Sequence, residues 1–156
     1  MVKLNLGCGG DIREGYVNID VRKIERVDLV LDLESERLPY GDGTVDEILA
    51  KDVLEHFSYR KVEEILKDWH RVLKPRGVLT IQTPDFDQIV KYYTEGKIKS
   101  WWELSYWLYG GQEYKENTHK CIFTKPELCD LLKSIGFEVV ECHNDNSNMI
   151  VKVVKR

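Results

Sequence analysis

The chain has 156 residues, of which 42% are hydrophobic and 32% are charged, a composition typical of one globular domain with its own core. The formal net charge of −4 disfavours binding to a nucleic-acid backbone, which calls for a basic patch. No apolar run approaches the roughly 20 residues that span a bilayer, and no signal peptide precedes the first predicted strand, so we expect a cytoplasmic protein without nucleic-acid or membrane partners.

The first predicted strand, residues 2–6, runs directly into the glycine-rich residues 7–10, and a second strand, residues 16–19, ends at Asp20. Glycine lets the backbone pass close beneath a ligand, and an acid at the end of the next strand can accept hydrogen bonds from two ribose hydroxyls. The pattern therefore predicts a nucleotide-cofactor site. A dinucleotide-binding Gly-x-Gly-x-x-Gly would need a third glycine where Ile12 stands, which weakens a dehydrogenase alternative.

Two more strands are predicted over residues 28–33, which contain Asp32, and over residues 45–50. The polar stretch 51–56 follows the second of these. Apolar residues at helical spacing then predict a helix from Ser58, as N-cap, to Leu73.

A fifth strand is predicted over residues 78–83, just before Asp85. Apolar strands that alternate with helices indicate a mostly parallel sheet with helices on both faces. Ligands bind beyond the carboxyl ends of such strands. We therefore expect residues 7–10, Asp20, Asp32, residues 51–56 and Asp85 to converge at one edge of the sheet.

Residues 86–114 hold nine of the sixteen aromatic residues and should form one or two helices, with breaks at Gly96 and at Gly110 and Gly111. One alternative is a cap over the site, formed by an insertion at about 86–120. The other is that the rings pack against the sheet edge or a second subunit, as in a homodimer through the aromatic segment.

The end of the chain reads as a helix over residues 124–135, with Thr124 as N-cap and Gly136 as C-cap. Residues 137–142 and 149–154 follow as two strands with a short connection, which predicts an antiparallel hairpin. The four cysteines form no C-x-x-C pair and neither His119 with Cys121 nor Cys142 with His143 has zinc spacing, so we expect reduced thiols and no metal.

Five motifs together resemble those of class I S-adenosylmethionine-dependent methyltransferases, specifically the small type 11 branch. They are Leu6–Gly9, Asn18–Asp20, Asp32 with Leu38–Pro39, Val53–His56 and Arg71–Gly77. The resemblance covers nearly everything except residues 86–120. It implies a single domain over residues 1–156, with a Rossmann-like seven-stranded sheet in the order 3-2-1-4-5-7-6, strand 7 antiparallel and helices on both faces.

The resemblance also implies S-adenosylmethionine as the cofactor and a set of residues that bind it. Those expected to bind it are Gly7, Cys8 and Gly9 near the methionine part, Asp20 at the ribose, Asp32 and Leu33 at the adenine, and Lys51, Asp52 and Val53 on the methyl side, together with Val21. This chain departs from the family pattern at Asn5, where an acid is frequent, and at Lys51 and Asp52, where many relatives have Ser-His.

The reaction implied is methyl transfer to a small or medium-sized acceptor at oxygen or nitrogen. Alignment of the acceptor with an activated methyl group supplies much of the acceleration, and a general base removes the proton of a hydroxyl or ammonium acceptor. His56 is the first candidate for that base by its ordinary pKa, followed by Asp52 and Asp85. A binding module without turnover and, less favoured, a nucleotide-dependent oxidoreductase are the alternatives.

Overall fold

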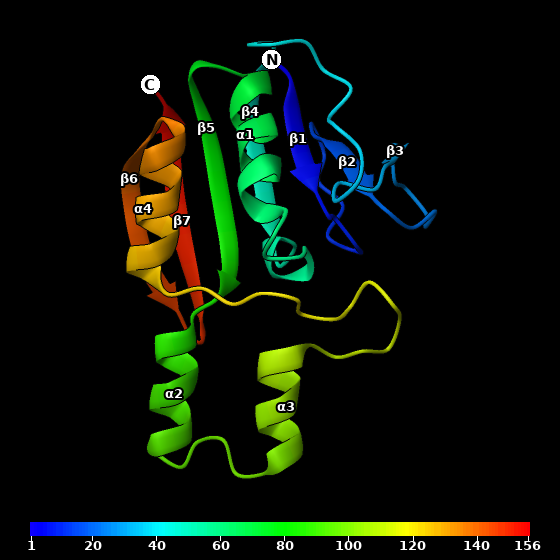
Figure 1. The fold of residues 1–156 in the computed structure, drawn as a ribbon. Coiled ribbons are helices and arrows are strands. Elements are labelled where there is room, and N and C mark those ends of the chain that lie inside the picture. The colour runs from blue at the N-terminus through cyan, green and yellow to red at the C-terminus, as the bar shows by residue number, and fades with distance from the viewer.

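A computed structural model describes all 156 residues and contains one seven-stranded sheet (Figure 1). The strands are β1 (Lys3–Leu6), β2 (Val17–Asp20), β3 (Leu29–Val30), β4 (Val45–Lys51), β5 (Leu73–Pro84), β6 (Phe137–Asp145) and β7 (Asn148–Lys155). Their order is β3-β2-β1-β4-β5-β7-β6, and β7 runs antiparallel to both of its neighbours. The predicted strand order and the C-terminal hairpin are confirmed.

The helical elements are a short 3₁₀ helix η1 (Leu54–His56), α1 (Val62–Val72), α2 (Phe86–Thr94), α3 (Trp101–Tyr109) and α4 (Lys125–Ile135). In Figure 1, α1 and α4 lie side by side on one face of the sheet. The connections that follow β1, β2 and β3 contain no helix. No helix is both long enough and apolar enough to cross a lipid bilayer.

Two predicted boundaries move because the chain forms turns there. The third strand is shorter than predicted, since the Asp32 carboxylate accepts from the Glu34 amide at 3.0 Å and turns the chain. Helix α1 begins at Val62 because residues after Ser58 first form a turn, in which the Ser58 carbonyl accepts from the Lys61 amide at 2.8 Å. Thr124 and Gly136 flank α4 as predicted, and Gly136 adopts a φ of 117°.

The hydrophobic core lies between the sheet and the helix pair α1 and α4. Leu66 and Trp69 of α1 and Leu132 of α4 are almost completely buried in the same cluster as Leu4 and Ile48 of the central strands. Full burial of side chains of this size contributes about 1.5–3 kcal/mol each. The core therefore holds the carboxyl ends of β1, β2, β4 and β5 in a fixed relation.

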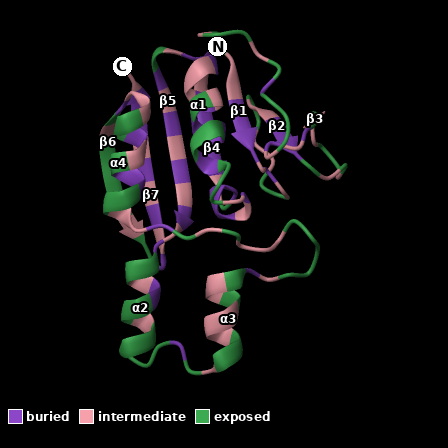
Figure 2. Cartoon of the chain, in the orientation of Figure 1, coloured by how far each residue is buried: buried purple, intermediate pink, exposed green.

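Helices α2 and α3 stand beyond those carboxyl ends, and the return segment 110–124 crosses back over them toward α4 (Figure 1). Figure 2 shows the two helices as mostly exposed or half-buried. No residue of α3 is buried, and Trp101 is 82% exposed. The exposure of α3 therefore disfavours the alternative in which its rings pack against the sheet.

Candidate active site

In the loop after β1, glycines adopt positive φ angles that other residues rarely adopt. Gly7 has a φ of 59°, and a Cβ atom there would lie 2.3 Å from Val53 Cγ2 at the end of β4. Gly9 has a φ of 49°, and its amide donates to Asp20 Oδ2 at 2.8 Å. Substituting Gly7 would therefore strain the backbone and displace Val53 at once.

Two buried asparagines close this loop from below. Asn5 Nδ2 donates to Asn18 Oδ1 at 3.0 Å and to the Asp11 carbonyl at 2.7 Å. Asn18 Oδ1 also accepts from the Arg13 amide at 2.9 Å. Asn5, which stands where relatives often have an acid, thus has a structural role here, and the importance of Asn18 was missed because nothing local in the sequence pairs it with Asn5.

Asp20 ends β2 and is 5% exposed. Besides the Gly9 contact, its Oδ1 accepts from the Arg22 amide at 2.9 Å and from Arg22 Nε at 3.1 Å. The Arg22 guanidinium in turn lies 4.0 Å from the ring centre of Tyr114 in the return segment. An ion pair and two backbone donors thus compensate the buried carboxylate.

Asp32 lies at the cavity wall, but its carboxylate is engaged with its own turn. Oδ2 accepts from the Ser35 hydroxyl at 2.7 Å, and this bond is the main reason that the pKa of Asp32 lies below its ordinary value. The backbone of Leu33 borders the same cavity. A contact between Asp32 and an adenine stays a prediction.

Asp52 follows β4 with a φ of 50°, an uncommon conformation for a residue other than glycine. Gln82 Nε2 donates to its two carboxylate oxygens at 3.2 and 3.0 Å. The surrounding protein raises the pKa of Asp52 by desolvation. Its carboxylate is nevertheless open to the cavity.

Glu55, His56 and His119 form a cluster at the back of the cavity. Glu55 is 2% exposed, accepts from the Thr83 hydroxyl at 3.0 Å, and has a pKa raised to about 8 by burial. His56 Nδ1 lies 3.2 Å from the Thr118 carbonyl oxygen, which can only accept, so Nδ1 holds the proton of the neutral ring. Burial lowers the pKa of both histidines, which favours neutral rings at pH 7.

The donor types of this cluster are those that bind transition metals, and one such atom of each residue lies within 4.8 Å of the others. The two imidazole rings, however, meet edge to face with centroids 5.0 Å apart. His56 can offer only Nε2 to an ion, because its Nδ1 proton is held by the Thr118 carbonyl. The metal-free expectation stays a prediction.

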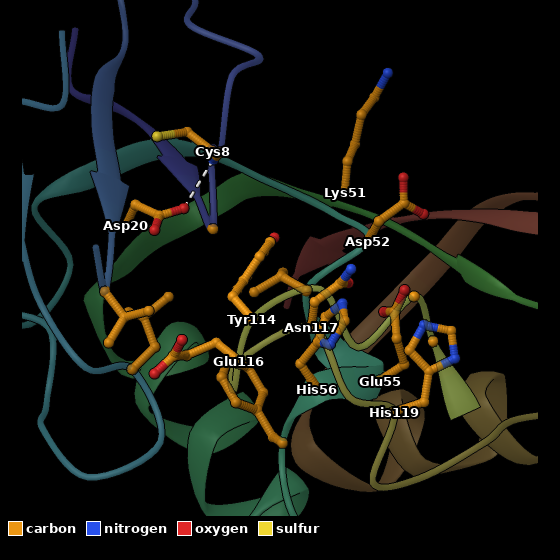
Figure 3. Close-up of a pocket in the computed structure, with 18 of the residues that line it drawn as sticks. Cys8, Asp20, Lys51, Asp52, Glu55, His56, Tyr114, Glu116, Asn117 and His119 are labelled. Carbon is orange, nitrogen blue, oxygen red and sulfur yellow. Dashed lines mark hydrogen bonds between the residues drawn. The ribbon is translucent and has the colours of Figure 1, made fainter. Parts of the chain in front are cut away.

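These groups surround one cavity of about 840 Å³, within the range of small-molecule sites (Figure 3). Of the residues predicted for the site, the structure brings to this cavity Gly7, Cys8, Gly9, Asp20, Val21, Asp32, Leu33, Lys51, Asp52, Val53 and His56. Cys8 is 5% exposed, and burial raises the pKa of its thiol to about 11, which keeps the thiol protonated at neutral pH.

Asp85 was wrongly predicted to face the site. It is completely buried, does not border the cavity, and accepts from the Asp87 amide at 3.2 Å as the N-cap of α2. Asn144 Nδ2 donates to its other oxygen at 2.7 Å. A position after β5 is compatible with a site residue or with a helix N-cap. Because α2 begins directly after Asp85, the residue is an N-cap.

The insertion contributes much of the remaining wall, and most of its lining residues were not predicted individually, although Trp107 was expected to lie over the acceptor. They are Tyr106, Trp107, Gly110, Gly111, Tyr114, Lys115, Glu116, Asn117, His119 and Lys120. Lys120 Nζ pairs with Glu34 at 2.6 Å, and the Lys120 amide donates to the Glu55 carbonyl at 2.8 Å. The aromatic content of the segment was the one available signal, because a loop has no periodicity from which to assign a facing side chain.

Comparisons with known proteins agree with this geometry. A family model described as a methyltransferase domain matches residues 4–142. A 1,6-didemethyltoxoflavin-N1-methyltransferase from Burkholderia thailandensis, solved with 1,6-didemethyltoxoflavin and S-adenosylhomocysteine, has a TM-score of 0.66 at 17% identity over 99% of this chain and 70% of that chain. A comparison with curated protein sequences finds no match.

Two further solved structures have the same fold. A SAM-dependent methyltransferase from Methanosarcina mazei has a TM-score of 0.67 at 18% identity over 98% of this chain and 91% of that chain. The [4+2]-cyclase SpnF has a TM-score of 0.64 at 16% identity over 98% of this chain and 73% of that chain. At such identities, the structures establish the fold alone.

The sheet order, the glycine loop and the acid after β2 define a class I, Rossmann-like methyltransferase fold. Because the family model spans most of the chain, the protein belongs to the methyltransferase domain family and is an S-adenosylmethionine-dependent methyltransferase. This result disfavours the oxidoreductase alternative.

Proposed function

We propose that this enzyme methylates an oxygen or nitrogen atom of a small or medium-sized molecule held between the carboxyl edge of the sheet and residues 86–120. The observation that carries the proposal is the meeting of the glycine loop, Asp20 and residues 51–53 around one cavity. A nucleic-acid acceptor is disfavoured by the net charge of −4.

The cavity fits the cofactor in size and chemistry. The side-chain-free backbone at Gly7 and Gly9 suits the methionine part, the buried Asp20 carboxylate suits the ribose hydroxyls beside Val21, and Asp32 and Leu33 suit the adenine. Lys51, Asp52 and Val53 would line the methyl side. When bound, S-adenosylmethionine supplies an activated methyl group.

We propose that His56 or Asp52 is the base that removes the proton of the acceptor. His56 has its Nδ1 proton held by the Thr118 carbonyl, so Nε2 carries the lone pair that can accept a proton. A base of lowered pKa remains available at neutral pH. Asp52 offers a carboxylate open to the cavity, whereas Asp85 is not part of this proposal.

The insertion supports two further parts of the proposal. Residues 114–120 contact both sides of the cavity, through Arg22 and Glu34, which suits a cap over bound ligands. The outer surface of α3 presents Trp101 and Trp102, and we assign it to a contact between two copies of the chain.

Calorimetry with the Asp20→Ala variant tests the cofactor site. Loss of hydrogen bonds to a charged group costs about 1.5–3 kcal/mol each, so S-adenosylmethionine should bind at least tenfold more weakly while the protein remains folded. Asp130→Ala, an exposed acid on α4, is the matched control. Unchanged affinity of a folded Asp20→Ala protein, or preferential binding of NAD by the wild type, contradicts the proposal.

A screen for release of S-adenosylhomocysteine across an acceptor panel tests turnover. Release that depends on one class of acceptor supports methyl transfer. Binding of S-adenosylmethionine without release for any acceptor favours a binding module with this fold.

A further inference from the structure

Three planar polar side chains line one side of the cavity and are connected to one another. Gln82 of β5 donates to both oxygens of Asp52 at 3.2 and 3.0 Å, and Asn148, the first residue of β7, donates to Asp52 at 3.5 Å. All three border the same cavity. Together they offer neighbouring amide and carboxylate groups, which is the arrangement that pairs of hydroxyl groups can both donate to and accept from.

The backbone fixes the position of Asp52 beside Gln82 and Asn148. Its φ of 50° is uncommon for a residue with a side chain, and its amide donates to the Gln82 carbonyl at 2.9 Å. Strained residues persist where the surrounding structure imposes them, and they cluster at functional sites. The position of the carboxylate is thus imposed by the pairing of β4 with β5.

Aromatic rings of α3 border the same cavity. Trp107 is half-buried and lies edge to face with Tyr92, with ring centroids 6.3 Å apart, while Tyr106 is exposed. The negative face of such a ring attracts the weakly positive C–H groups on one side of a sugar ring. Figure 3 places the insertion residues Tyr114 and Asn117 in the cavity between Asp20 and Asp52.

Other acceptor classes fit the lining less well. An anionic acceptor would meet more acidic than basic side chains in this cavity. Besides the buried Glu55, the acids are Asp11, Asp20, Asp32, Glu34, Asp52 and Glu116, and the cations are Arg22, Lys51, Lys115 and Lys120, of which Arg22 and Lys120 are already paired. A flat aromatic acceptor needs a mainly apolar wall, but only nine of the 33 lining residues are hydrophobic.

Taking the proposed methyl transfer as its basis, we propose that the acceptor is a carbohydrate whose neighbouring hydroxyls bind Asp52, Gln82 and Asn148. In the reaction a sugar hydroxyl oxygen gains the methyl group, the C–S bond breaks with its electron pair left on sulfur, and the hydroxyl proton passes to a base of the site. The products are a sugar methyl ether and S-adenosylhomocysteine.

Saturation-transfer NMR on the protein loaded with S-adenosylhomocysteine tests this assignment directly, without turnover. The probes are methyl α-glucopyranoside, methyl α-mannopyranoside, catechol and phenethylamine at equal concentrations. We expect saturation transfer to at least one pyranoside and none to catechol. Three results overturn the carbohydrate assignment. They are transfer to catechol, transfer to the amine without transfer to a pyranoside, and transfer to no probe.

Matched variants show whether these polar side chains bind the pyranoside. Gln82→Met and Asn148→Leu keep side-chain size but remove the amide, and each should weaken pyranoside binding at least tenfold, whereas affinity for S-adenosylhomocysteine should stay within twofold. Gln88→Met on α2, outside the cavity, is the control. Unchanged pyranoside binding in both cavity variants overturns the assignment. Failure of the wild type to bind S-adenosylhomocysteine would instead overturn the proposed function.

Discussion

At Gly7 the sequence motif and the tertiary packing both require glycine, because the residue has a φ of 59° and a Cβ atom there would lie 2.3 Å from Val53 Cγ2. Asp20 shows the same agreement, since the acid predicted from the strand end is the one that accepts from Gly9. Asp85 shows the opposite case. Its position after β5 predicted a site residue, but a helix begins there and uses the carboxylate as a cap.

Glu55 provides a prediction at the residue scale. Its folded pKa of about 8 lies above the ordinary 4.5, so the folded protein keeps a proton that the unfolded chain releases between these values. Stability should therefore fall as pH rises from about 4.5 to about 8. Glu55→Gln removes this titration, and its melting temperature should exceed that of the wild type by about 3 °C or more at pH 8.5, with a smaller difference at pH 5.

Thermal unfolding at the two pH values checks this expectation. Glu127→Gln, a substitution of an exposed acid in the first turn of α4, serves as the control. A difference between Glu55→Gln and wild type that does not change with pH would show that burial of the Glu55 carboxyl is not coupled to its ionisation.

At the scale of the elements, segment 110–120 contacts both sides of the cavity. One end contacts Arg22 through Tyr114, and the other pairs with Glu34 through Lys120. Because Arg22 also bonds Asp20, the cap and the proposed ribose site share one side chain. A contact of this kind was not predictable, since Arg22 and Tyr114 are far apart in the sequence.

The corresponding prediction concerns hydrogen exchange. Arg22→Ala removes both contacts of the guanidinium, so amides of residues 110–120 should exchange several-fold faster than in the wild type. Arg60→Ala is the matched control, because Arg60 lies 5.6 Å from the ring centre of its exposed neighbour Tyr59. Exchange that is equally fast in wild type and Arg22→Ala would show that the segment is held by its other contacts.

On the scale of the whole molecule, α3 has seven hydrophobic residues among its nine and yet has no buried residue. A helix of this kind is normally covered. The charged residues of 86–111 balance, with Lys91, Lys97 and Lys99 against Asp87, Glu95 and Glu103, so two copies of this surface do not repel each other. We therefore expect a homodimer through α3.

Light scattering after size exclusion measures the mass directly. The wild type should have twice the chain mass of 18.3 kDa, and a Trp101→Asp, Trp102→Asp double variant should have the mass of one chain. Tyr59→Asp changes an equally exposed ring elsewhere on the surface and should remain dimeric. A wild type that remains monomeric at high concentration would contradict the predicted homodimer.

The sequence by itself determined the glycine loop, the acid after β2 and the C-terminal hairpin, because hydrophobic periodicity and local backbone preferences act within a few residues. The strand order followed only from the resemblance to class I methyltransferases. The resemblance of five ordered motifs also identified the cofactor. Only the tertiary structure decided that Asp85 is a cap, that α3 is uncovered, and that Gln82 and Asn148 join Asp52. These outcomes depend on contacts between residues far apart in the chain, which strand pairing and helix packing create.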